Sequence, residues 1–398
     1  MDVITTNAEL EAFCARMALQ PFVAVDTEFM RETTYWPKLC LVQVCGADGD
    51  AAAIDPLADD LEPDPLLDLL ENPEVLKVFH AARQDIEIFN NLGVLPEPLF
   101  DTQVAAMAAG FGEQIAYDAL MRQLVNADID KSSRFTDWSR RPLADSQLSY
   151  ALADVTHLAR AYPKLRDRLD RDGRLAWVQE EMGSLIDPAY YDTDPEKAWQ
   201  RLKPRKYTPK YLAVFKAVAA WRERTAQDRD TPRGRVLKDD AIDELAAQAP
   251  TTPEALERLR SVPKGYGGSR YGPALLDAIR AALVDPEAYA PKIERAPPPP
   301  QNAGAAVELL KVLLKARAEE AGVASKLIAT VSDLERIAVG DPDATPLHGW
   351  RRQVFGEDAL RLHRGELALV LNGARVRVIE ASADDAHVAG EVKRVRQR

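Results

Sequence analysis

The sequence predicts an α/β domain with a mixed sheet flanked by helices, followed by two small all-α units. Three observations support this prediction. Apolar runs typical of strands alternate with helical spacing up to about residue 190. The strand signal fades after about residue 200, where helical spacing continues. Residues 291–300 end in four consecutive prolines, which cannot continue a helix and therefore predict an extended linker between the two helical units.

The elements of the α/β region follow from the spacing of its apolar residues. Short apolar runs predict strands at residues 22–25, 39–45, 51–54, 75–79 and 99–100. Helical spacing predicts helices at residues 66–70, 85–91 and about 145–169, and Gly93 ends the second of them. Strands in succession, followed by strands that alternate with helices, favour a mixed sheet.

The rest of the chain is expected to be mainly helical. Helical spacing occurs at residues 211–224, 241–248, 253–259, 274–283, 305–321, 325–337 and 350–360. The helical units before and after the Pro-rich linker have a similar size, which suggests a diverged duplication without a clear repeat. Residues 374–398 alternate apolar and basic side chains and form either a hairpin or a basic tail. The expected boundaries are an α/β domain at 1–190, helical units at 205–288 and 303–373, a Pro-rich linker at 289–302, and the tail at 374–398.

Composition narrows the functional classes. The length of 398 residues favours two or three domains, and no apolar run approaches the roughly 20 residues of a membrane span. The N-terminus lacks the basic start and apolar centre of a secretory signal, and the three cysteines are expected to be buried thiols, so we expect a cytoplasmic protein. A net charge of -12 argues against a globally basic nucleic-acid binder. It leaves open an acidic metal site that reaches phosphate through its cations.

Acidic residues at element ends suggest such a site. Asp26 and Glu28 lie two apart at the end of a predicted strand, so both side chains point to one face. Paired carboxylates repel, and a hard divalent cation relieves that repulsion. A solvated strand end is the alternative for this pair alone. Asp85 opens a predicted helix after the strand at 75–79, where an acid is also expected simply because the helix dipole favours it.

A Tyr–Asp pair on the long helix completes the pattern. Tyr150 and Asp154 are four residues apart and therefore neighbours on one helix face. A phenol one turn from a carboxylate can hold a water beside a metal, although an exposed polar face would show the same spacing. Asp101 is expected to cap a helix rather than to bind a metal. Together, the four carboxylates and Tyr150 predict a site for two divalent cations that hydrolyses a phosphodiester.

Three motifs in this order also resemble a known family. The segments VAVDTEF, FHAARQDIEIF and YALAD resemble the three motifs of the DEDDy 3′→5′ exonucleases. The stretches RETTYWPKLCLVQV and DWSRRPLADSQLSYALADVTHLARAYPKL are similar to the ribonuclease D family in particular, and the resemblance covers the whole chain. It implies a ribonuclease H-like exonuclease domain followed by two HRDC-like domains. GWRRQVFGEDALRL is similar to the end of the second HRDC domain.

The resemblance implies roles at matching positions. Asp26, Glu28, Asp85 and Asp154 would hold two Mg²⁺ or Mn²⁺ ions, and Tyr150 would assist the attacking water. In the sister class a His stands where this chain has Ser149, so the tyrosine version is present. The family often has Ser where this chain has Ala144, and we expect Asp145 or Ser146 to cap the helix instead.

Several aromatic and basic residues are candidates for RNA contact, each with a structural alternative. Phe29 either wedges against a terminal base or belongs to the core, and Trp36 either stacks on a base or packs. Arg134, Arg140 and Arg141 flank Trp138 and suit a backbone groove or a solvated loop. Residues 201–235 carry a local excess of positive charge that either grips RNA phosphates or forms a solvated face. The candidates in this stretch are Lys203, Arg205 and Lys206.

We therefore expect a 3′→5′ exoribonuclease. Its substrates would be tRNA precursors and other structured RNAs with single-stranded 3′ tails, and its products nucleoside 5′-monophosphates. No membrane and no obligate protein partner are implied. Two alternatives remain: a 3′→5′ DNA exonuclease with the same chemistry, and a non-catalytic RNA-binding scaffold. A scaffold should have lost at least one of the carboxylates, whereas this chain has all four.

Overall fold

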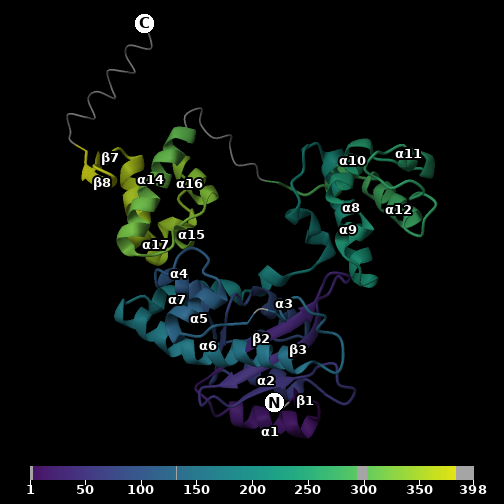
Figure 1. Ribbon diagram of the computed structural model, residues 1–398. Helices are drawn as coiled ribbons and strands as arrows, with labels where there is room; N and C mark the ends of the chain where they lie inside the picture. The colour runs from purple at the N-terminus through teal and green to yellow at the C-terminus, as the bar shows by residue number, and fades with distance from the viewer. Residues whose placement is uncertain (1–2, 131, 294–302, 382–398) are drawn as a thin grey trace.

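The computed structural model describes residues 3–130, 132–293 and 303–381 (Figure 1). Its α/β domain contains a mixed six-stranded sheet, as predicted, with the order β1-β4-β3-β2-β5-β6. β2 pairs antiparallel with β3, and β3 with β4, while the three remaining pairs are parallel. The strands are β1 (Val3–Ile4), β2 (Phe22–Met30), β3 (Lys38–Gly46), β4 (Ala51–Ile54), β5 (Leu76–Phe79) and β6 (Leu99–Asp101).

Helices cover this sheet. β2 and β3 lie inside the sheet, and their apolar runs are long because the described helices bury both faces of these strands. The longest helix, α6, packs against β2, β3 and β4. The helices are α1 (Asn7–Met17), α2 (Asp64–Glu71), α3 (Arg83–Asn91), α4 (Thr102–Ala108), α5 (Tyr117–Val125), α6 (Asp145–Arg171) and α7 (Leu175–Leu185).

The sequence did not predict β1, α1, α5 or α7, which are short or weakly periodic. The expected cap of α6 was also wrong. Ala144 stands at the N-cap without a side-chain cap, and its N–H donates to Gln147 Oε1 at 3.0 Å. A glutamine side chain thus satisfies one of the free groups at the helix start.

The first helical unit comprises α8–α13 and has its own apolar core around α8. Short 3₁₀ turns at Pro188–Tyr191 and Pro195–Arg201 lead into it from the α/β domain. Its helices are α8 (Pro209–Asp228), α9 (Arg233–Val236), α10 (Asp239–Gln248), α11 (Pro253–Glu257), α12 (Gly272–Ala282) and α13 (Pro286–Tyr289).

The second helical unit comprises α14–α18 and a β-hairpin. The helix expected at 325–337 is divided, because Ala329 is extended and Thr330 caps a new helix by accepting from Asp333 N. The hairpin is one of the two forms expected for the tail, and the expected boundary at 374 falls inside it. Residues 382–398 and most of the Pro-rich linker lie outside the described residues. The elements are α14 (Ala303–Ala321), α15 (Ser325–Ile328), α16 (Val331–Ala338), α17 (Gly349–Arg351), a π-helical turn (Arg352–Gly356), α18 (Glu357–His363), β7 (Leu367–Asn372) and β8 (Arg375–Glu380).

The second helical unit shares an apolar core with the α/β domain. Trp350 stacks on Trp177 of α7, with ring centroids 4.7 Å apart, and its indole N–H donates to Glu181 at 3.0 Å. Arg174 donates to the backbone carbonyls of Ala321 and Gly322 at the end of α14. This unit is therefore packed onto the α/β domain near α4 and α7 (Figure 1).

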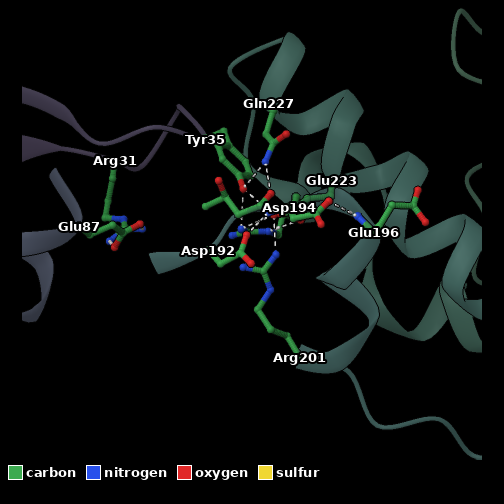
Figure 2. A network of polar contacts seen from close by, with 11 residues as sticks. Arg31, Tyr35, Glu87, Asp192, Asp194, Glu196, Arg201, Glu223 and Gln227 are labelled. Atoms are coloured by element: carbon green, nitrogen blue, oxygen red, sulfur yellow. Dashed lines mark hydrogen bonds and ion pairs between the residues drawn. The ribbon is translucent and has the colours of Figure 1, made fainter. Parts of the chain in front are cut away.

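The first helical unit meets the α/β domain through the connection between β2 and β3. The Asp230 carboxylate accepts from the backbone N–H groups of Tyr35 and Trp36 at 2.9 Å. The Tyr35 hydroxyl donates to Glu223, a buried carboxylate that also pairs with Arg233 and Arg201 at 2.6 Å (Figure 2). The connection that leaves β2 is thus fixed to the helical unit. Within the described ranges, no helix is both long and apolar enough to span a membrane.

Candidate active site

Three of the predicted carboxylates meet where β2 passes under α6. Asp26 and Glu28 lie on one face of β2, and Asp154 comes from the third turn of α6, which faces them. Each offers an oxygen, and these oxygens all lie within 4.8 Å of one another. The strand period of two and the crossing of α6 over β2 bring these residues together, although they are far apart in the sequence.

Asp85 approaches from the first turn of α3. It is buried, it accepts a hydrogen bond from the Thr27 hydroxyl, and its charge interacts with that of Asp26. Asp85 does not belong to the group of three carboxylates whose oxygens all lie within 4.8 Å of one another. Asp101 holds the start of α3 in place, since its carboxylate accepts from the N–H groups of Ala81 and Ala82 at 3.0 and 2.9 Å. It also caps α4, which confirms the predicted capping role.

Burial and mutual repulsion raise the pKa values of these carboxyl groups, because both effects disfavour the charged form. Burial, with repulsion from the neighbouring carboxylates, raises the pKa of Glu28 to about 9. Burial and the charge of Asp26 raise the pKa of Asp154 to about 8, and burial raises that of Asp26 to about 7. The pKa of Asp85 is raised well above its usual range by the same two effects. A bound cation would reverse these shifts.

The donor set fits a hard divalent cation. All four groups are carboxylates, the ligand type that Mg²⁺ and Mn²⁺ prefer. Asp154 Oδ1 is buried and has no hydrogen-bond partner among the described residues, which leaves it available as a ligand. Asp26, Glu28 and Asp154 form a group that could hold such an ion.

Two tyrosines contact Asp154. Tyr150 lies one turn before it, and burial together with the charge of Asp154 raises the pKa of the Tyr150 phenol above its ordinary value. The phenol is therefore protonated at neutral pH and can donate a hydrogen bond. Tyr117, at the start of α5, donates its hydroxyl to the backbone carbonyl of Asp154. No sequence signal points to Tyr117, because nothing in its local pattern places α5 beside α6.

These groups line a cleft of about 460 Å³. Phe29 also lines this cleft. The strand register shifts between Glu28 and Phe29, which places Cys40 of β3 in a β-bulge. Phe135 also lines the cleft and is 91% exposed, with the Arg134 guanidinium 5.2 Å from the centre of its ring. An aromatic ring this exposed adds little to the core, so Phe135 is a candidate for contact with a base.

Two of the residues proposed for RNA contact are engaged elsewhere. Arg141 forms a two-pronged ion pair with Asp55 at 2.5 and 2.6 Å and donates to the Cys40 carbonyl at 2.7 Å, so it fixes the segment before α6 to the sheet. Trp36 packs against the core of the first helical unit. RNA contact by either residue stays a prediction. Arg140 is exposed but does not line the cleft.

The basic stretch of the first helical unit is largely neutralised. Arg205 pairs with Asp243 at 3.1 Å, whereas Lys203 and Lys206 are exposed and make no ion pair with another described residue. Further cations in this stretch pair with acids of the same unit or of the segment that leads into it. These are Arg201, Lys216, Arg222, Arg224 and Arg233. The positive charge free to meet RNA is therefore smaller than the sequence indicates.

Comparison with known proteins gives the family. A 3′-5′ exonuclease family model matches residues 1–170, and an HRDC domain model matches residues 211–279. A ribonuclease D of Nitrobacter hamburgensis is 53% identical, over 96% of this chain and 100% of that protein. A ribonuclease D of Acidiphilium cryptum is 51% identical, over 95% of this chain and 97% of that protein.

A solved structure agrees with these relatives. Escherichia coli RNase D, described as an exoribonuclease involved in structured RNA processing, matches with a TM-score of 0.80 and 27% identity. The match covers 92% of this chain and 98% of that one. The paired carboxylates, the Tyr–Asp helix and the near full-length matches therefore agree: the chain belongs to the ribonuclease D family and is a 3′→5′ exoribonuclease.

Proposed function

We propose that this exoribonuclease holds two divalent ions, Mg²⁺ or Mn²⁺, on its four carboxylates. The observation that carries the proposal is the cluster of Asp26, Glu28 and Asp154 oxygens within 4.8 Å. These three residues would hold one ion, and Asp26 with Asp85 the other. Ions bound in this way lower the pKa of water and stabilise charge on the leaving oxygen.

The side chains around the cluster prepare the substrate. Tyr150 keeps its proton and orients the attacking water by a hydrogen bond. Arg134 lines the cleft, and its positive charge offsets part of the rise in the pKa of Glu28 and Asp154. The same positive charge favours a bound phosphate. Phe29 and Phe135 offer ring surfaces to the terminal bases. Attack at the last phosphodiester releases a nucleoside 5′-monophosphate.

The substrates are tRNA precursors and other structured RNAs with single-stranded 3′ tails. The E. coli relative is described as acting in structured RNA processing, which supports this choice. The cleft admits a chain end, and the exposed Lys203 and Lys206 of the first helical unit provide positive charge that can meet the folded part of an RNA. Contact at both places would raise the local concentration of the tail at the cleft.

Two further features fit this assignment. The carboxylates and Tyr150 are brought together in one cleft, which favours a catalyst over an RNA-binding scaffold. Cys14, Cys40 and Cys45 are buried free thiols, as a reducing cytoplasm allows. DNA as the substrate has the same chemistry and is an outcome of the experiment that follows.

The experiment compares degradation of a tRNA precursor with a 3′ extension and of a DNA of the same sequence, with Mg²⁺ and with chelator. We expect Mg²⁺-dependent removal of the RNA extension and slower loss of DNA. Faster degradation of the DNA would contradict the RNA assignment, and activity that persists in chelator would contradict the metal site.

Point variants are a better test than a truncation of whether the first helical unit binds RNA. Removing the second helical unit would expose the core that it shares with the α/β domain. We expect the double variant Lys203→Ala/Lys206→Ala to bind the precursor with a log-affinity against log-salt slope smaller by about 2. Lys315→Ala/Lys326→Ala, on exposed lysines of the second unit, is the matched control. Equal slopes for both variants would show that the first unit does not grip RNA.

A further inference from the structure

A buried glutamine lies beside the carboxylate cluster. Gln43 is in the middle of β3, an interior strand, and it is 0% exposed. Neither its amide nitrogen nor its amide oxygen has a hydrogen-bond partner among the described residues. Nearly all buried polar groups in proteins are hydrogen-bonded, so a fully buried amide with two unpaired atoms indicates a partner that binds at this place.

The strand register identifies the neighbour of this amide. Gln43 stands directly opposite Asp26 in the antiparallel pair of β2 and β3. Side chains of directly opposed residues share one face of the sheet, with their Cβ atoms roughly 4.5–5.5 Å apart. The flexible Gln43 side chain can therefore reach the Asp26 carboxylate, either directly or through one enclosed water.

The other neighbours of Gln43 are apolar. On the side away from Asp26 it stands opposite Ala53 of β4, and Leu41 is its neighbour along the strand on the same face. Ala53 and Leu41 belong to an apolar cluster with Leu148 and Ala151 of α6, and Trp138 is part of the same cluster. The Trp138 indole N–H is also buried without a hydrogen-bond partner among the described residues, but the strand register places the Asp26 carboxylate, not Trp138, directly opposite Gln43.

We propose that Gln43 is a positioning residue of the metal site, whose amide holds the Asp26 carboxylate in the orientation that binds a cation. Outer groups of this kind fix the direction of a ligand, and their loss commonly weakens metal binding by about 10- to 100-fold. The backbone N–H of Thr27 is the hydrogen bond that the structure shows stabilising ionised Asp26. An amide donor from Gln43 would add a second. The inference rests on the proposed metal site.

Binding of Mn²⁺ to the full-length protein, measured by calorimetry without RNA, tests the role of Gln43. Gln43→Met keeps the length of the side chain and removes its polar atoms. We expect this variant to bind Mn²⁺ about 10- to 100-fold more weakly. Its thermal midpoint in chelator should be no lower than that of the wild type, because the unpaired amide is gone. The half-maximal Mg²⁺ concentration for exonuclease activity should rise by the same factor.

The matched control is Val44→Ala, at the next position of β3 and also 0% exposed, on the opposite face of the sheet. It should lower the thermal midpoint and leave the Mn²⁺ affinity unchanged. Equal Mn²⁺ affinity of Gln43→Met and wild type would overturn this inference alone, whereas no Mn²⁺ binding by the wild type would overturn the metal site itself.

A structure of the wild type with Mn²⁺ gives the answer even if Gln43→Met does not fold. The inference requires the Gln43 amide to lie roughly 2.7–3.2 Å from an Asp26 oxygen, or from a water bonded to it. An amide that bonds elsewhere in that structure would overturn the inference.

Discussion

Asp154→Asn should stabilise the metal-free protein while it removes a metal ligand. Burial and the charge of Asp26 raise the pKa of Asp154 to about 8, from an ordinary value of 3.8. The folded state therefore binds a proton that the unfolded state has already lost at pH 7. Below the pKa of Asp154 in the unfolded state, this proton contributes fully to the stability of the fold. The contribution is lost as the pH rises through the pKa of Asp154 in the folded state.

The size of the effect follows from the two pKa values. At 1.36 kcal/mol per pH unit, keeping this carboxyl in the folded site costs up to about 4 kcal/mol at pH 7. At pH 4 the same calculation gives less than about 1 kcal/mol.

Urea denaturation in chelator, at pH 7 and at pH 4, measures this difference. We expect Asp154→Asn to have the larger free energy of unfolding at pH 7 and to approach the wild type at pH 4. Addition of Mn²⁺ should stabilise the wild type and leave the variant unchanged, since only a protein that binds the ion gains from it. The control is Asp145→Asn, an exposed acid in the first turn of the same helix, whose loss should cost about 0.3–1 kcal/mol. A variant less stable than the wild type at pH 7, or a gain equal at both pH values, would refute the reasoning.

Three further predictions concern the cleft and the docked unit. Tyr150→Phe should lower kcat by about 10²-fold or more with unchanged Mn²⁺ affinity, because the protonated phenol orients water and does not hold metal; weaker Mn²⁺ binding would contradict this role. Phe135→Ala should raise KM for a single-stranded RNA about 5- to 150-fold and leave the urea midpoint unchanged, since the ring is 91% exposed; an unaltered KM would exclude stacking. Trp350→Ala should lower the free energy of unfolding, measured with urea, by about 3–5 kcal/mol, because it removes a buried ring stacked on Trp177. A loss below about 1 kcal/mol would mean that this contact does not hold the second unit in place.

The sequence predicted the elements whose signal is local. The apolar runs of β2 and β3 marked strands, and the period of two placed Asp26 and Glu28 on one face. The four-residue spacing likewise placed Tyr150 beside Asp154. The two-residue strand β1 is too short to show a pattern, and its position depends on pairing with β4.

What the sequence missed depends on contacts between distant segments. Arg141 pairs with Asp55, 86 residues away, a contact that its basic neighbourhood in the sequence did not indicate. Tyr117 and Phe135 enter the cleft only through the placement of α5 and of the segment before α6. The break before Thr330 was visible as a Thr-x-x-Asp capping pattern, but continuous helical spacing on both sides outweighed it.

The central claim is that the clustered carboxylates hydrolyse RNA from its 3′ end with bound divalent ions. The most direct measurement follows a 5′-labelled RNA with a 3′ tail, using the wild type and Asp26→Asn with Mg²⁺, and the wild type in chelator. The account predicts stepwise shortening and release of nucleoside 5′-monophosphates by the wild type with Mg²⁺, and intact RNA in the other two reactions. Shortening in chelator, or by folded Asp26→Asn at the wild-type rate, would contradict it.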